Sequence, residues 1–385
     1  MPTPRGIAVA AAAAMLVAVG LLLGYRELLV LGATGLTVVL MAALWVGAPP
    51  RLAIDRTVRP DRIRRGASSD VIIDVHSASG RTRVLEAEDT FLGPHGARRM
   101  AVPPIRVRGG APARISYRLP TDRRGVFTVG PLRIGRTDAL GLCSASSQQG
   151  GTASLIVRPL VHAVRGVPVG VSPSLEGTVD AAVHGSITFH ALREYRIGDD
   201  LRHVHWRTSA KVGQMMVREH LDTALPRVVV MLDDRAGVHD PEHFEQMCEA
   251  AASVLFAVHR ADLPIELRLA GGARADGSMG RVLDALAAAV PAARVDLAGA
   301  ARRLRERPAG DTVVLITSSG GAGRSEAGSA AVAALRATYS CVVVGVLGAS
   351  GGQYDTVAAQ PGVVVLAAAD AADFARRWDR VRRWG

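Results

Sequence analysis

The densest run of chemically capable side chains lies at residues 193–211, which read REYRIGDDLRHVHWRTSAK. Two adjacent carboxylates, Asp199 and Asp200, stand close to two imidazoles, His203 and His205. Carboxylate and imidazole groups held together can move protons in acid–base catalysis or ligate a metal ion. A metal-dependent or acid–base hydrolase that uses this cluster is therefore one hypothesis for the chain.

The same run also predicts a structural turn. Gly198 allows a sharp bend, and either aspartate can then cap a helix that opens at about Leu201. On such a helix the two histidines point roughly 200° away from each other, which is poor for joint ligation. Trp206 is expected to be a buried anchor. We favour this structural or partner-binding interpretation, in which four arginines bridge carboxylates and carbonyls at a domain junction: Arg193, Arg196, Arg202 and Arg207.

A second candidate site follows the apolar run RVVVML at Asp233-Asp234-Arg235-Ala236-Gly237. In open α/β sheets, ligands bind beyond the carboxyl ends of the strands. The sequence here resembles a von Willebrand A-type domain, whose D-x-S-x-S loop holds a divalent cation. Asp233 matches the aspartate, but Arg235 and Gly237 replace the serines, and Thr317-Ser318-Ser319 replaces a later aspartate. Hard cations need several oxygen ligands. We therefore predict no metal and no other cofactor, with Asp233 as only a weak candidate ligand.

Two uncharged apolar runs, residues 7–23 and 28–48, open the chain. At about 1.5 Å per residue they would span roughly 26 and 32 Å, close to a hydrocarbon thickness of about 30 Å. We expect a transmembrane hairpin over residues 1–50. A cleaved signal peptide is the alternative, and the second run directly behind the first disfavours it. Six arginines follow within residues 51–65, so the positive-inside rule predicts a two-pass protein of the plasma membrane with cytoplasmic soluble domains.

The formal net charge of +11 is concentrated beside these runs, because residues 51–137 hold 18 arginines against 8 acidic residues. Basic groups near an anionic leaflet gain about 1 kcal/mol each. We hypothesise that anionic lipid contacts this segment, and an arginine-rich solvated surface is the alternative. A nucleic-acid binder is a further hypothesis, but the arginines have no aromatic platforms beside them, so no nucleic acid is expected.

Other signatures of chemistry are missing from the sequence. Lys211 is the single lysine, so there is no P-loop, and no G-x-S-x-G elbow occurs. Cys143, Cys248 and Cys341 are far apart and have neither disulfide nor zinc spacing.

The soluble part of the chain changes its pattern twice. Residues 51–165 contain short β-branched runs between Gly and Pro, which predict an all-β sandwich of roughly seven strands. Residues 166–221 form a connecting segment that contains the charged run. From 222 to 385, apolar strands alternate with helices, which predicts a parallel sheet covered on both faces. The fold class is thus a multidomain membrane protein with a helical hairpin, an all-β sandwich and an α/β domain.

The stretch GSITFHALREYRIGDDLRHVHWRTSAKVGQMMVREH resembles the signature of a bacterial family catalogued as domain of unknown function fifty-eight. His205 departs from the signature, since the family usually has aspartate there. Upstream, Leu119-Pro120-Thr121, Arg123-Arg124-Gly125 and Asp138 with Gly141-Leu142 resemble the family's sandwich segment. The signature positions that match are Phe189, Arg193, Tyr195, Gly198, Asp199, Arg202, Trp206, Ser209, Ala210, Lys211, Val217, Arg218 and Glu219.

The resemblance implies a membrane-anchored interaction or scaffold protein without enzymatic activity, because the family has no established reaction. Family members are typically encoded beside MoxR-type AAA+ ATPases, which implies such an ATPase as partner in the assembly or maturation of other proteins. We expect no catalytic residue. The predicted interaction residues are Phe189, Arg193, Tyr195, Gly198, Asp199, Asp200, Arg202, Trp206, Lys211, Arg218 and Glu219.

Overall fold

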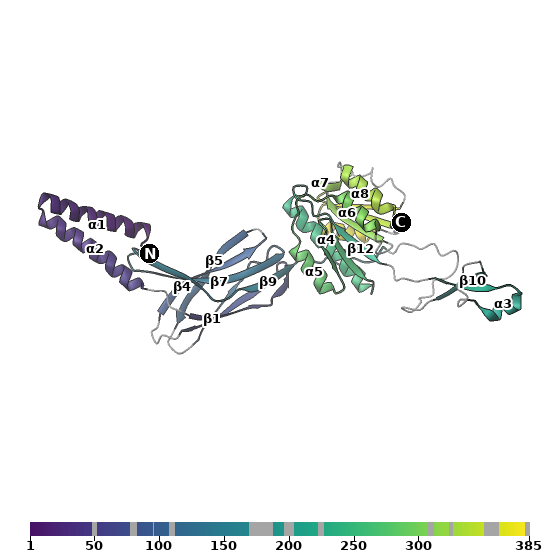
Figure 1. The fold of residues 1–385 in the computed structure, drawn as a ribbon, viewed down its shortest axis with the longest axis horizontal. Helices are drawn as coiled ribbons and strands as arrows, with labels where there is room; N and C mark the ends of the chain where they lie inside the picture. Colours follow the sequence, from purple (N-terminus) through teal and green to yellow (C-terminus); the bar gives the residue numbers. More distant parts are fainter. Residues whose placement is uncertain are drawn as a thin grey trace. The chain divides into compact units, whose positions relative to one another are not determined.

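The computed structural model describes residues 1–47, 52–77, 83–94, 96–107, 112–168, 188–195, 204–221, 227–306, 312–322, 326–349 and 362–381 (Figure 1). The chain divides into two compact units. The first comprises residues 1–160 together with 283–290, and the second comprises residues 161–282 and 291–385.

Two long helices, α1 (Pro4–Leu23) and α2 (Arg26–Val46), open the first unit. Gly24 ends α1 in the left-handed conformation, with φ at 72°. The two helices pack closely at Gly32, where a Cβ would lie only 2.6 Å from the carbonyl oxygen of Ala13. Both helices are long and apolar enough to cross a membrane. The prediction of two apolar helices of spanning length is confirmed, and the side on which the soluble parts lie stays a prediction.

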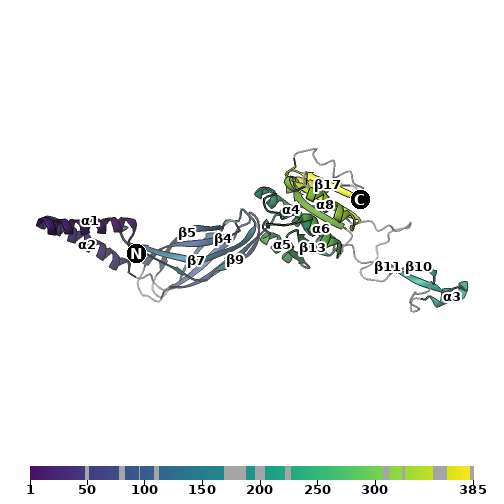
Figure 2. The ribbon, with the colours of Figure 1, turned by 45° about the horizontal axis from the view of Figure 1, so that its top comes forward.

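The remainder of the first unit is β-structure in two sheets (Figure 2). An antiparallel sheet has the order β1-β3-β6, and a mixed sheet has the order β2-β9-β7-β4-β5, with β8 paired to β7. The strands of the first sheet are β1 (Leu52–Arg59), β3 (Asp70–Ser77) and β6 (Ala113–Arg118). Those of the second are β2 (Arg62–Arg64), β4 (Arg83–Gly93), β5 (Gly96–Val107), β7 (Gly125–Thr137), β8 (Ser144–Gln149) and β9 (Ala153–Arg158).

One hydrophobic core lies between these sheets, because alternate residues of each strand point to the same face. A buried ion pair crosses the core. Arg56 of β1 donates to both carboxylate oxygens of Asp89 on β4, at 2.8 and 2.9 Å, and the hydroxyl of Tyr117 on β6 also donates to Asp89. Burial and this hydrogen bond raise the pKa of Tyr117 far above its ordinary value, so the phenol stays protonated.

The second unit is built on a six-stranded sheet of order β14-β13-β12-β15-β16-β17. All neighbouring strands are parallel except β13 and β14. The strands are β12 (Val228–Leu232), β13 (Ile265–Leu269), β14 (Arg274–Asp276), β15 (Thr312–Ser318), β16 (Cys341–Leu347) and β17 (Val363–Ala368). The helices that accompany them are α4 (Pro241–Arg260), α6 (Leu297–Glu306), α7 (Ser319–Ala322), α8 (Glu326–Arg336) and α10 (Ala371–Trp378). Helix α5 (Met279–Ala288) begins in this unit, and its residues from 283 onward belong to the first unit.

Helices cover both faces of this sheet, which explains why β12, β15 and β16 are buried along their whole length. Helices α6 and α8 join one core with alternate residues of these strands. Helices α4 and α10 contact each other and the sheet, and Gly345 leaves room for Phe374 of α10, since a Cβ there would lie 2.7 Å from the ring. The predicted parallel sheet with two covered faces is confirmed, and the antiparallel edge strand β14 was not predicted.

Two further segments precede the sheet within the second unit. Residues 161–168, here called the strap, lie against α4 and α10: the backbone N–H of His162 donates to Ser253 at 2.9 Å, and Trp378 Nε1 donates to the carbonyl of Gly166 at 3.2 Å. The second segment is a two-stranded antiparallel sheet of β10 (Thr188–Glu194) and β11 (Met216–Leu221), with α3 (Trp206–Val212) between them. We call it the β10–α3–β11 ribbon (Figures 1 and 2).

The buried pair between the sheets gives a first prediction. Replacing Asp89→Asn leaves the Arg56 guanidinium buried without its counter-charge, and we expect the free energy of unfolding to fall by about 3 kcal/mol. Asp74→Asn is the matched control, because Asp74 pairs with the exposed Arg114 and its loss should leave stability almost unchanged. Urea unfolding of the full chain in detergent measures both, and equal effects would contradict the prediction.

Candidate functional site

The candidate site lies at the carboxyl ends of β12 and β15. The chain passes from β12 to β13 on one side and later returns to β15 on the other side of β12, which makes this point a topological switch. Buried polar residues gather here: Asp233 and Asp234 follow β12, and Thr317 and Ser318 end β15. His239, in the loop that leads into α4, also has a fully buried side chain.

Asp233 and Arg235 form an ion pair at the centre of this site. Arg235 donates from Nε to Asp233 Oδ1 at 2.8 Å and from a terminal nitrogen to Oδ2 at 2.7 Å, a bidentate arrangement. Thr317 Oγ1 donates to the same Oδ2 at 2.8 Å. The guanidinium also donates to the carbonyl of Gly321 at 3.2 Å. Both oxygens of Asp233 are therefore engaged by side chains of the protein itself.

The environment keeps Asp233 ionised. Burial alone would raise its pKa, but the hydrogen bonds from Arg235 and the closeness of the His239 ring outweigh burial and hold the pKa well below its ordinary value. Its neighbour Asp234 behaves in the opposite way. Burial raises the pKa of Asp234, and the hydrogen bond that its carboxylate accepts from the N–H of Gly271, at 2.7 Å, offsets this only in part. The two adjacent carboxyls thus differ because one has a counter-charge.

Ser318, His239 and Asp233 form a row that has the residue types of a nucleophile, a base and an orienting carboxylate. Ser318 Oγ lies 2.6 Å from His239 Nδ1, and His239 Nε2 lies 3.3 Å from Asp233 Oδ1 without hydrogen-bond alignment. A catalytic serine must be reached by its substrate, whereas Ser318 and His239 are buried. The row therefore acts as internal polar packing.

These residues do not fit a divalent cation. Octahedral coordination needs free carboxylate and hydroxyl oxygens, and here Arg235 brings a fixed positive charge against the one suitable carboxylate. Within the described ranges, no three His, Cys, Asp or Glu side chains come together as a metal site. The side chain of Arg235 supplies the positive charge that Asp233 requires.

The difference between the two aspartates is testable. Asp233→Asn leaves the Arg235 guanidinium without its counter-charge and should lower the free energy of unfolding by about 3 kcal/mol. Asp234→Asn should change it by less than about 1 kcal/mol, because an amide oxygen can still accept from Gly271. Since the folded-state pKa of Asp233 is depressed, its contribution is present above the ordinary carboxyl pKa of about 3.9 and is lost as the pH falls below it. Denaturant unfolding at several pH values tests this, and an equal loss in both variants would contradict it.

The role of the guanidinium gives another prediction. Wild-type protein should show the same melting temperature with EDTA and with millimolar Mg²⁺. Arg235→Ser removes the built-in positive charge and adds a hydroxyl, so Mg²⁺ should raise the melting temperature of this variant by several degrees. Differential scanning calorimetry measures the shift. If the wild type gains as much as the variant, Arg235 does not stand in for an ion.

The predicted interaction residues are divided between described and undescribed parts of the chain. Gly198, Asp199, Asp200 and Arg202, together with His203, lie outside the described residues. The β10–α3–β11 ribbon contains six of the other seven, and Tyr195 directly follows β10. The pairing of the ribbon places its two strands side by side, with Arg193 opposite Val217. These seven residues are Phe189, Arg193, Tyr195, Trp206, Lys211, Arg218 and Glu219.

Two expectations about the charged run are wrong. The helix does not continue through residues 204–205, because Val204 forms a β-bridge with Val217 and His205 donates its N–H to the carbonyl of Met216. The helix α3 begins only at Trp206, and His205 caps it by accepting the N–H of Thr208 on Nδ1 at 3.1 Å. Trp206 is not a buried anchor, since 66% of it is exposed. A residue that directly follows an extended, strand-paired segment starts the helix and does not lie in the middle of its buried face.

The two arginines of the upstream motif, Arg123 and Arg124, have different environments. Arg124 is buried and donates from one terminal nitrogen to the carbonyls of Leu286, Ala287 and Ala289, at 2.8, 3.2 and 2.7 Å, within the first unit. It thereby supplies a donor to carbonyls at the end of α5, of which that of Leu286 also accepts the N–H of Ala289 at 3.3 Å. Local sequence patterns do not reveal this role, because the contact joins residues more than 160 positions apart.

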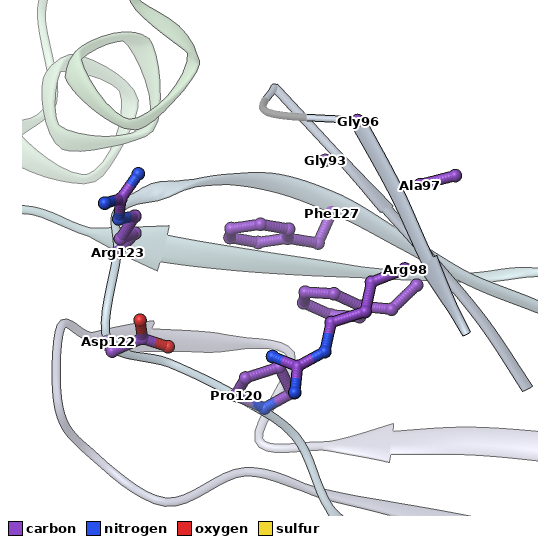
Figure 3. Close-up of a pocket in the computed structure, with 9 residues that line it drawn as sticks. Gly93, Gly96, Ala97, Arg98, Pro120, Asp122, Arg123 and Phe127 are labelled. Carbon is purple, nitrogen blue, oxygen red and sulfur yellow. The ribbon is translucent and has the colours of Figure 1, made fainter. Parts of the chain in front are cut away.

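Arg123 lines a surface pocket of about 200 Å³ (Figure 3). The stacked rings of Phe91 and Phe127, 4.6 Å apart, form its apolar floor, and Arg98 extends from β5 on the other side of the rings. Among the described lining residues, Asp122 is the single carboxylate. An apolar floor with guanidinium groups at the rim suits an apolar side chain beside an anion, and offers no residue set for turnover.

Many arginines of residues 51–137 already have partners. Arg56 and Arg124 are buried, while Arg62, Arg114 and Arg118 pair with Asp61, Asp74 and Asp70. These carboxylate partners are already subtracted in the surplus of 18 arginines over 8 acidic residues, so the pairs leave that surplus unchanged, and among these arginines Arg124 is the one buried against backbone carbonyls instead. The lipid hypothesis stays a prediction.

Comparison with known proteins gives one family match. Residues 191–322 match the model of a family described as "Protein of unknown function DUF58". A search of curated proteins found no match.

Some solved structures are similar over parts of the chain. The alkylpurine DNA glycosylase AlkC of Pseudomonas fluorescens, bound to DNA containing an abasic site analog, is 18% identical over 32% of this chain and 33% of that chain, with a TM-score of 0.23. A CARDB domain from Pyrococcus furiosus in complex with di-metal ions is 9% identical over 28% of this chain and 93% of that chain, with a TM-score of 0.19. A β-glucosidase of Listeria innocua in complex with glucose is 11% identical over 26% of this chain and 16% of that chain, with a TM-score of 0.19. The chain spans about a third of the first of these structures.

Proposed function

We propose that this chain, of which residues 191–322 match the model of the DUF58 family, is a membrane-anchored interaction protein without enzymatic activity. In this proposal the α1–α2 hairpin spans the plasma membrane twice, and the arginines that follow α2 keep the soluble parts in the cytoplasm. The two β-sheets with their common core form a sandwich. The second unit binds a partner protein.

The second unit is, in our proposal, a degenerate von Willebrand A-like domain. Its strand order, with one antiparallel edge strand, supports this. In the proposed ancestral arrangement a cation would sit at the switch point, and here Arg235 takes its place against Asp233. A site whose charge is balanced internally cannot offer a metal ion to a partner's carboxylate. Partner binding is therefore assigned to another surface.

The observation that carries the proposal is the exposed face of the β10–α3–β11 ribbon. Trp206 is 66% exposed, and Val212 and Met215 are also exposed large apolar residues. Arg207 and Lys211 lie four positions apart on α3, both exposed, and neither has a carboxylate partner among the residues described. Exposed aromatic residues with neighbouring cations are typical of the energetic centres of protein interfaces.

The ribbon also needs support that it does not supply itself. An isolated two-stranded sheet is marginally stable in water, and within the described part of this segment a helix of seven residues accompanies it. A bound partner that covers Trp206 would supply the missing burial. The complementary surface is apolar with acidic groups, and the family resemblance nominates a MoxR-type AAA+ ATPase as the protein that carries it.

Affinity capture tests this proposal. The full chain, solubilised in detergent, should capture the MoxR-type ATPase of the same genome. Trp206→Ala and Lys211→Glu should each weaken capture by about tenfold or more, equivalent to about 1.4 kcal/mol. Val126→Ala is the matched control, because Val126 is also an exposed apolar residue but lies in β7 of the other unit. Capture of no ATPase, with or without ATP, would remove the partner assignment, and capture that is unaffected by either ribbon variant would remove the ribbon.

A further inference from the structure

The turn at residues 138–143, between β7 and β8, is held closed by its own aspartate. The carboxylate of Asp138 accepts the N–H of Leu140 at 2.9 Å and the N–H of Cys143 at 2.5 Å. These hydrogen bonds, led by that of Cys143, hold the pKa of Asp138 below its ordinary value. The turn is therefore rigid, and its negative charge is already satisfied by backbone amides.

The start of α1 is fastened to this turn. The N–H of Thr3 donates to the carbonyl of Leu142 at 2.9 Å, and its hydroxyl donates to the carbonyl of Gly141 at 2.6 Å. The terminal ammonium of Met1 donates to the carbonyl of Ser144 at 2.6 Å. Helix α1 approaches so closely that a Cβ at Gly6 would collide with the carbonyl of Leu142.

The end of α2 is fastened to the same turn by apolar packing. Leu142 and Cys143 form a buried cluster with Ala42 and Val46, near the last residue of α2. Figure 1 accordingly marks the N-terminus at the base of the hairpin. The turn thus contacts the first residues of one apolar helix and the last residues of the other.

This position fixes the height of the turn relative to a bilayer. If both helices span the hydrocarbon, the turn lies where they leave it, in the headgroup layer. Trp45, 67% exposed near the end of α2, has the residue type and position of an interfacial anchor. Leu140, 64% exposed at the tip of the turn, points an apolar side chain out from the same level.

We propose that the 138–143 turn is a third membrane contact, in which Leu140 enters the boundary between headgroups and acyl chains of the leaflet from which both helices emerge. The partner is the lipid surface itself. Two helices alone would let the β-sheets of the first unit tilt relative to the membrane, whereas a third contact point on a rigid turn limits this tilting. The inference rests on the proposed membrane anchoring.

Depth-dependent fluorescence quenching tests the inference in the full chain reconstituted into phosphatidylcholine vesicles. A polarity-sensitive dye is attached to Leu140→Cys, to Val38→Cys in the middle of α2, or to Val126→Cys in β7. The native cysteines are buried, and unsubstituted protein gives the labelling background. We expect quenching by acyl-chain nitroxide lipid at 38, by headgroup-level nitroxide lipid at 140, and by aqueous iodide at 126.

The three labels separate the two possible failures. If position 140 is quenched by iodide as strongly as position 126 while position 38 remains in the hydrocarbon, the third contact is wrong and the anchor stands. If position 38 is also open to iodide, the membrane anchoring itself is wrong.

A second pair of variants tests the seat of the turn. Gly6→Val places a side chain against the carbonyl of Leu142 and should unseat the turn, so that iodide quenching at 140 rises about threefold while the label at 38 stays protected. Ala8→Val is the matched control, since Ala8 is exposed on α1 and has no such contact. Equal quenching at 140 in both variants would show that the seat does not hold Leu140 in the lipid.

Discussion

The ion pair between Arg235 and Asp233 shows the constraint under which this chain is built. A guanidinium cannot lose its proton inside a protein, so every buried arginine must be given acceptors. The chain meets this demand with different acceptors: a carboxylate and the Gly321 carbonyl for Arg235, a carboxylate shared with a tyrosine for Arg56, and backbone carbonyls for Arg124. In each case the charge is used up within the fold.

That constraint separates charges that hold the structure from charges that can act on something else. Arg235 neutralises Asp233, the carboxylate that a metal would need, so the charge at the switch point of the α/β sheet is balanced within the protein. Among the residues that the structure describes, exposed cations lie on α3 beside Trp206 and at the rim of the pocket between β4, β5 and β7.

How far the sequence predicts the structure depends on how local each cause is. Strands β12, β15 and β16 were predicted because burial on both faces forces a continuous apolar run. Strand β14 was not predicted because its three residues, two of them charged, are too few to show the alternation of apolar and polar residues that indicates a strand. The weakness of Asp233 as a metal ligand could be read from Arg235 two positions later, although the bidentate geometry could not.

Non-local contacts account for the errors and omissions. A helix that opened at Leu201 would carry Trp206 on its buried face. The pairing of Val204 with Val217 shows instead that the helix begins at Trp206. The seat of α1 on the 138–143 turn joins residues 139 positions apart, which no periodicity within either segment reveals. The signature at 193–211 was found as a motif, but half of its charged centre lies outside the described residues.

The strap has a practical meaning for work on the second unit. His162 lies 3.1 Å from the buried carboxylate of Glu249, and the N–H of Arg165 donates to Asp379 at 2.5 Å, so these eight residues are part of the surface of α4 and α10. A fragment that begins at the first β-strand of the sheet would uncover Glu249 and the indole of Trp378 to water. Anyone who wishes to express the α/β unit alone should therefore start it at Val161, well upstream of its first strand.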